Sequence, residues 1–172
     1  MKIISVDMDG VLADVYSQFI KMHKEEFGEI LLLENLYGMT ESEAFTHAMQ
    51  YVRRDDFFRS APVIEGSPEI LKKLNEQYKV FIVSSATEFP KSLTEKQSWL
   101  NEHFPFISWQ QMVFCGSKEI IKADIMIDDH FKNLDHFDGE TFLFTQPHNQ
   151  LNNNHKHRRV NSWYEIEKIL LP

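Results

Sequence analysis

The stretch "IISVDMDG" (residues 3–10) joins a short apolar run to two acidic residues and a glycine. A nearly continuous apolar, β-branched run of this length is typical of a strand that is buried on both faces of a parallel sheet. Asp7 and Asp9 follow it directly, and two interpretations are open. They form an ordinary Asp-Gly turn out of the strand, or they are paired catalytic carboxylates at its carboxyl end.

The whole chain limits the classes of protein to consider. It has 172 residues, of which 42% are hydrophobic and 26% charged, the balance of one globular domain with room for a modest insertion. The net charge of −8 argues against a nucleic acid polymer as partner but leaves room for a small phosphorylated molecule. A single cysteine, Cys115, excludes an internal disulfide and a multi-cysteine metal site. With no long apolar run or signal-like segment, we predict no membrane association and a cytoplasmic location.

Short apolar runs alternate with helical patterns along the chain. Strands are predicted over residues 3–6, 79–84, 111–115, 124–127 and 141–144, and helices over 67–77, 92–104 and the stretch after Ser162. We expect Ser67 to be the N-cap of the first of these helices, with Pro68 at its first position, and Ser162 to form a capping box with Glu165. This alternation predicts an α/β fold with a doubly wound, Rossmann-like parallel sheet.

Residues 12–65 interrupt this alternation of strands and helices. They hold two long helical patterns, at 15–28 and 40–58, and no convincing strand. We therefore predict a core domain made of residues 1–11 and 66–172, with a small helical cap, 12–65, inserted after the first strand.

Polar residues follow several of the predicted strands. Ligands of open α/β sheets bind outside the carboxyl ends of the strands, so these residues are expected to meet there. Each one alone has an ordinary explanation as a turn, a cap or a solvated lysine, but independent accidents seldom place all of them at one edge. The set consists of Asp7 and Asp9, Ser84 and Ser85, Lys118, and Asp128 with Asp129.

This set fits phosphate chemistry. A carboxylate that attacks a dianionic phosphate ester meets a repulsion of about 8 kcal/mol, taking about 4 kcal/mol for each unit pair near 4 Å at an effective dielectric constant of 20. One serine and one lysine do not cancel that repulsion. A divalent cation does, and Asp128 and Asp129 are hard oxygen ligands of the kind that Mg²⁺ prefers.

Two other acid-rich motifs are the main alternative explanations for these residues. A calcium loop starting at Asp7 requires a ligand at Val11, glycine at Leu12 and glutamate at Gln18, and all three positions fail. A phospho-signalling receiver domain also uses acids, a hydroxyl and a lysine, but its lysine normally comes last. Here Lys118 precedes the final acid pair.

The order Asp-x-Asp-Gly, strand-end serine, lysine and Asp-Asp resembles the four motifs of the haloacid dehalogenase-like superfamily. More narrowly, the chain resembles the 5'(3')-deoxyribonucleotidases. The narrower resemblance rests on "DDFFRSAPVIEGS" (55–67), "KADIMIDDH" (122–130), "LFTQPHNQ" (143–150) and "HRRVNSWYEIEKIL" (157–170). It covers nearly the whole chain and is weakest over residues 29–52.

The resemblance implies a phosphatase that removes phosphate from nucleoside monophosphates. It implies that Asp7 is the nucleophile that becomes an aspartyl-phosphate and that Asp9 is the general acid and base. It also implies an Mg²⁺ cofactor held by Asp7, the backbone carbonyl of Asp9 and Asp128, with Asp129 in the outer shell.

The same resemblance implies that Ser84 and Lys118 hold the phosphate, with further contacts from Ser85 and Lys96. A base needs a stacking surface, which aromatic residues of the cap could provide. The candidates are Phe19, Phe27, Tyr37, Phe45, Phe57 and Phe58.

Two alternatives stay open: a phosphatase of the same superfamily that acts on another small phosphate ester, and a non-catalytic phosphate-binding module. The oligomeric state is also open, with a homodimer as one option.

Overall fold

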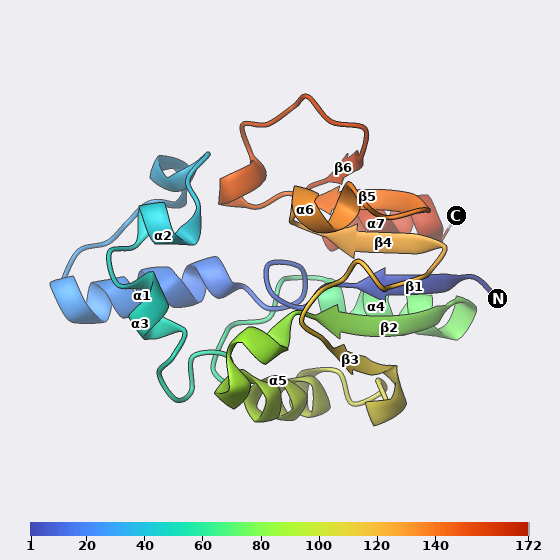
Figure 1. Cartoon of the computed structure of the whole chain (residues 1–172), viewed down its shortest axis with the longest axis horizontal. Coiled ribbons are helices and arrows are strands. Elements are labelled where there is room, and N and C mark those ends of the chain that lie inside the picture. The colour runs from blue at the N-terminus through green and yellow to red at the C-terminus, as the bar shows by residue number, and fades with distance from the viewer. Residues whose placement is uncertain (172) are drawn as a thin grey trace.

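The computed structural model describes residues 1–171, and within them six strands form one parallel sheet with the order β3-β2-β1-β4-β5-β6 (Figure 1). The predicted doubly wound α/β fold is therefore confirmed. The strands are β1 (Ile3–Val6), β2 (Lys79–Ser84), β3 (Met112–Phe114), β4 (Ile125–Asp128), β5 (Glu140–Phe144) and β6 (Arg158–Val160).

The apolar runs form the centre of the sheet because both of their faces are covered. Ile4 of β1 pairs with Val80 of β2 on one side and with Ile125 of β4 on the other, and all three side chains are buried. β6 was not predicted. It is a short edge strand with the sequence Arg-Arg-Val, in which only Val160 is fully buried, so it lacks the apolar run that marks the central strands.

Helices cover the sheet on both faces, with α4 (Ser67–Gln77) and α7 (Trp163–Leu170) behind it and α6 (Phe131–Leu134) in front in Figure 1. The helix predicted after β2 is α5 (Pro90–His103).

Two helix caps differ in detail from those predicted. Gly66, with φ of 79°, is the N-cap of α4, and Ser67 is its first residue. Ser162 caps α7 as expected, but the Glu165 carboxylate accepts its bond from Asn161 N at 2.8 Å.

Residues 12–65 contain α1 (Val15–Phe27), the 3₁₀ turn η1 (Leu33–Leu36), α2 (Glu41–Ala44) and α3 (Ala48–Tyr51). Figure 1 shows α1–α3 beyond the carboxyl ends of the strands. The single long helix predicted over 40–58 is wrong. The chain is extended at Phe45 (φ −126°, ψ 114°), whose fully buried ring stacks on Phe19 with 5.0 Å between centroids. The domain boundaries at 12 and 65 stay a prediction.

None of the helices in residues 1–171 combines the length and the apolar character needed to cross a membrane.

Candidate active site

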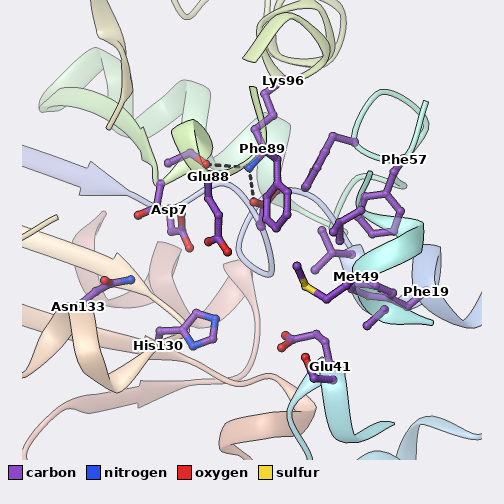
Figure 2. Close-up of a pocket in the computed structure, with 18 of the residues that line it drawn as sticks. Asp7, Phe19, Glu41, Met49, Phe57, Glu88, Phe89, Lys96, His130 and Asn133 are labelled. Atoms are coloured by element: carbon purple, nitrogen blue, oxygen red, sulfur yellow. Dashed lines mark hydrogen bonds and ion pairs between the residues drawn. The ribbon is translucent and has the colours of Figure 1, made fainter. Parts of the chain in front are cut away.

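A cavity of about 410 Å³ lies between the carboxyl ends of the strands and α1–α3 (Figure 2). This volume suits a small molecule. The strand-end side of its wall is polar and the opposite side is largely apolar. The polar side includes Asp7, Asp9, Ser84, Ser85, Lys96 and Lys118, and the apolar side includes Val15, Phe19, Met49, Val52, Phe57 and Phe58.

The topology of the sheet explains why the polar residues meet. After β1, the chain adds β2 and then β3 on one side of β1. It then crosses over and adds β4 on the other side. A crevice opens where the strand order reverses in this way. Asp7 follows β1 and Asp128 ends β4, so both carboxylates lie at that switch point.

Lys118 links these two carboxylates. Its Nζ lies 2.6 Å from Asp7 Oδ1 and 2.6 Å from Asp128 Oδ2. Asp128 also accepts hydrogen bonds from His130 N at 2.9 Å and from Asn133 Nδ2 at 3.0 Å. The backbone N–H of Met8 donates to Asp7 Oδ1 at 2.8 Å. Asp7, Lys118 and Asp128 are all buried, so their orientation is set by these bonds.

Lys96 makes a second link within the same polar wall (Figure 2). Its Nζ donates to the Asp9 carboxylate and, at 3.0 Å, to Ser84 Oγ. The side chain is buried although it comes from the middle of α5, and its Nζ lies 4.4 Å from the centroid of the Phe58 ring. The structure therefore brings Lys96 into the site. Ser85 lines the cavity beside it.

Burial shifts the protonation of the acidic cluster. The pKa of Asp7 is raised to about 7: burial is the main cause, Lys118 opposes it, and the charges of Asp128 and Asp9 add to it. Burial also raises the pKa of Asp129 well above its usual range, with Asp7 adding to the effect. For Lys118 burial lowers the pKa, but the Asp7 and Asp128 carboxylates outweigh it and the net shift is upward. If Asp7, Asp9, Asp128 and Asp129 were all ionised, they would carry more negative charge than Lys96 and Lys118 neutralise, and the raised pKa values of Asp7 and Asp129 lower that charge by keeping protons in the cluster.

The acidic cluster fits a hard divalent cation. Asp7, Asp128 and Asp129 each offer a carboxylate oxygen within 4.8 Å of the others, and all three side chains are buried. Asp129 Oδ1 is buried with no hydrogen-bond partner among the described residues. An unpaired carboxylate oxygen in the interior is costly unless a proton or a cation satisfies it. All-oxygen donors of this kind suit Mg²⁺.

Gly10 allows the chain to pass over this cluster. Its φ is +77°, and a Cβ at this position would lie 2.3 Å from Asp129 Oδ2. Both the backbone conformation and the close approach therefore require glycine.

The structure separates the predicted aromatic candidates. Phe19, Phe57 and Phe58 line the cavity, whereas Phe45 packs behind Phe19. Phe27 and Tyr37 are exposed and are not part of this lining. Sequence reasoning missed Phe89, Met49, Glu41, His130 and Asn133, which also line the cavity. Asn133 had a signal, because it is five residues after Asp128, in the short helix α6 that follows the strand.

Comparisons of the sequence give one family. The family of the 5' nucleotidase, deoxy (pyrimidine), cytosolic type C protein matches residues 1–172. The 5'(3')-deoxyribonucleotidase of Bacillus subtilis (strain 168) is 42% identical over 173 residues, which cover 99% of each chain. The enzyme of the same name from Bacillus phage SPbeta matches with the same identity and coverage.

Solved structures agree on the fold. A dehalogenase gives a TM-score of 0.61 at 15% identity, covering 100% of this chain and 98% of that one. YfnB of Bacillus subtilis, solved bound to magnesium, gives 0.60 at 14% identity, covering 98% of both chains. A HAD family hydrolase from Deinococcus radiodurans R1, solved with phosphate and sodium, gives 0.57 at 15% identity, covering 99% of this chain and 95% of that one.

Proposed function

The chain belongs to the 5'(3')-deoxyribonucleotidase family of phosphoric monoester hydrolases, and from that premise we propose that it is an Mg²⁺-dependent enzyme that hydrolyses deoxyribonucleoside monophosphates through an aspartyl-phosphate on Asp7. The observation that carries the proposal is the pair of lysine bridges. Lys118 holds Asp7 against Asp128, and Lys96 holds Asp9 against Ser84, on the wall of one cavity.

The phosphate is proposed to sit among Ser84, Ser85, Lys96 and Lys118. Both lysines are anchored by carboxylates, so their ammonium groups are oriented before the substrate arrives. Such preorganised charge stabilises a developing negative charge more than flexible surface lysines do. Asp7, the Asp9 carbonyl and Asp128, with Asp129 in the outer shell, would hold Mg²⁺, which would supply the remaining positive charge near the phosphate.

Asp7 is proposed as the nucleophile. Both of its hydrogen bonds, from Met8 N and from Lys118, fall on Oδ1, which leaves Oδ2 to attack. In the first step an Asp7–phosphorus bond forms, the bond from phosphorus to the sugar oxygen breaks, and that oxygen takes a proton from Asp9. In the second step Asp9 takes a proton from water, the oxygen of that water attacks phosphorus, and orthophosphate leaves Asp7.

Asp9 is suited to this double role by its two oxygens. Lys96 donates to Oδ2, whereas Oδ1 is buried and has no hydrogen-bond partner in residues 1–171. One oxygen therefore anchors the side chain and the other is available to give and take a proton.

The apolar wall supports a nucleoside as the leaving group. Phe89 is partly exposed in the cavity, and Phe19 and Phe58 keep 4% and 6% of their surface exposed, so these three rings offer aromatic surface to a base. Phe57 is fully buried against Phe19 and Phe58 and supports their positions.

A phosphate-release screen tests the proposal. Purified protein is assayed against deoxy- and ribonucleoside 5'- and 3'-monophosphates and against sugar phosphates, each with and without Mg²⁺. We expect the highest kcat/KM for a deoxyribonucleotide, and loss of activity after removal of Mg²⁺. Higher kcat/KM for a sugar phosphate would favour the other phosphatase, and no release from any substrate would favour a phosphate-binding module.

A further inference from the structure

We propose that Glu41, His130 and His148 form a second divalent-cation site, selective for a borderline ion such as Zn²⁺ and separate from the carboxylate cluster around Asp7. The three residues come from α2, the turn after β4 and the 3₁₀ turn η4 (Pro147–Asn149). Each offers a ligand atom within 4.8 Å of the other two. Figure 2 shows Glu41 and His130 on the same side of the cavity, across from Lys96.

The distances suit one small ion. Zn²⁺ binds imidazole nitrogen at about 2.0–2.1 Å and carboxylate oxygen at about 2.0–2.2 Å, so two of its ligand atoms lie up to about 4 Å apart. His148 Nδ1 and Glu41 Oε1 are separated by 3.8 Å. The His148 side chain is nearly buried and that of Glu41 is 28% exposed, which places the site at the edge of the cavity.

The protein orients His148 as it would a metal ligand. Its Nε2 lies 2.9 Å from the carbonyl oxygen of Asp129, which can only accept, so Nε2 carries the proton and donates. Nδ1 is then the nitrogen with the free electron pair, and it faces Glu41. Ligating histidines usually donate their other N–H to a carbonyl or carboxylate in this way.

The neighbours of His148 can adjust to an ion. Tyr16 donates its hydroxyl to His148 Nδ1 at 3.3 Å, but the Met39 carbonyl is a second acceptor for that hydroxyl at 3.4 Å. The His130 ring stacks on His148 with 4.4 Å between centroids and 16° between planes. It must turn out of that stack to aim a nitrogen at the ion, and its position on the cavity wall leaves space for the turn.

The donor types separate this site from the carboxylate cluster. Two imidazoles and one carboxylate favour Zn²⁺ over Mg²⁺, which prefers oxygen ligands and keeps much of its water. A bound Zn²⁺ would also tie α2 to the two turns at the strand-end edge, because α2 supplies one ligand and the turns supply the other two.

Zn²⁺ binding measured by competition with a chromogenic chelator tests the site. The protein is kept in saturating Mg²⁺, without substrate, so the outcome does not depend on the proposed function. We expect one Zn²⁺ per chain in the wild type, and affinity lowered at least tenfold by Glu41→Gln and by His148→Ala. The matched control is His136→Ala, which removes an exposed histidine and should keep the wild-type affinity.

Glu41→Gln keeps the test independent of folding, because Glu41 is partly exposed on a short helix. Wild-type affinity in that variant, or no Zn²⁺ binding by the wild type in saturating Mg²⁺, would overturn the proposal. Co²⁺ gives a second readout. It should show the intense visible bands of a four-coordinate ion in the wild type, and bands no stronger than those of aqueous Co²⁺ would also count against the site.

Discussion

The two walls of the cavity are built in different ways. The strand-end wall is a network of charges, in which Lys118 and Lys96 each hold two side chains. The opposite wall is made of aromatic and aliphatic side chains that pack mainly on one another, such as Phe57 on Phe19 with 4.8 Å between centroids. The first wall holds fixed charges around a reacting group, and the second offers an apolar surface that can match the shape of a substrate.

This difference predicts different responses to substitution. A buried charge that loses its partner is left uncompensated, so changes in the charged wall should act on chemistry and protonation with large effects. Packing in the aromatic wall is spread over many weak contacts, so a change of similar volume should have a small effect. The predictions below test this contrast, starting with the largest effect.

Asp9→Asn should have the largest effect, because it removes the proposed acid and base while keeping the shape of the side chain. We expect nucleotide turnover to fall by about 10²–10⁴-fold. p-Nitrophenyl phosphate has a good leaving group that hardly needs the proton, so this substrate should give a burst approaching one equivalent per site and then stall. The phosphate should remain covalently bound to Asp7, where mass spectrometry can detect it.

The matched control for Asp9→Asn is Asp138→Asn, which makes the same change at an exposed position. It should leave turnover of both substrates unchanged. Linear release of p-nitrophenol by Asp9→Asn, with no labelled protein, would contradict the role of Asp9.

Removal of Mg²⁺ should affect stability in a pH-dependent way. Burial raises the pKa of Asp7 from 3.8 to about 7, so between these values the folded protein holds a proton that the unfolded chain has released. Without Mg²⁺ the free energy of unfolding should therefore be highest near pH 4 and fall as the pH rises through 7. At pH 7.5, Mg²⁺ at 100 times its Kd should restore about 2.7 kcal/mol.

Urea unfolding at several pH values, with and without Mg²⁺, measures this effect. Asp7→Asn cannot titrate at this position, so its metal-free stability should depend less on pH than that of the wild type. An equal pH dependence in the two proteins would mean that Asp7 does not carry the shift.

The two walls also differ in how well the sequence predicts them. The positions of Asp7, Ser84 and Asp128 could be predicted because parallel strands end at one edge of the sheet. A polar residue at the end of an apolar run is therefore expected at that edge. Strand ends alone do not place Lys96 and Phe57, because the direction in which their segments face depends on how helices and turns pack. Lys96 was named through the family resemblance, and Phe57 only as one of six aromatic candidates. The turn at Phe45 shows the reason: a helical pattern continues through it, but burial of its ring against Phe19 breaks the helix.

The group of Glu41, His130 and His148 shows the same limit. The three residues come from three separate elements, and no spacing in the sequence relates them. β6 was missed for a different reason, because an edge strand needs few apolar residues.

Deoxyribonucleotides should be preferred over ribonucleotides by a smaller factor. An apolar wall near the sugar would leave a 2'-hydroxyl without a partner, at a cost of about 1–3 kcal/mol. This corresponds to a ratio of kcat/KM for dUMP over UMP of about 5-fold to 160-fold. Equal values for the two substrates would contradict the prediction without affecting the assignment as a phosphatase.

Phe58→Leu should have the smallest effect, and it tests the point where the two walls meet. The Phe58 ring lies 4.4 Å from Lys96 Nζ and packs edge-on against Phe57 with 4.9 Å between centroids. Leucine keeps much of the apolar volume but removes the cation–π contact and the aromatic pair, each worth about 1 kcal/mol.

Phe104→Leu is the control, because Phe104 is fully buried against Trp99 and does not line the cavity. Both variants should lose about 1–2 kcal/mol of stability in urea unfolding. Only Phe58→Leu should also lower kcat/KM, by several-fold, because Lys96 then holds Asp9 and Ser84 less rigidly. If the two variants kept the same kcat/KM, the aromatic wall would be acting only as core, and the contrast between the walls would be one of packing alone.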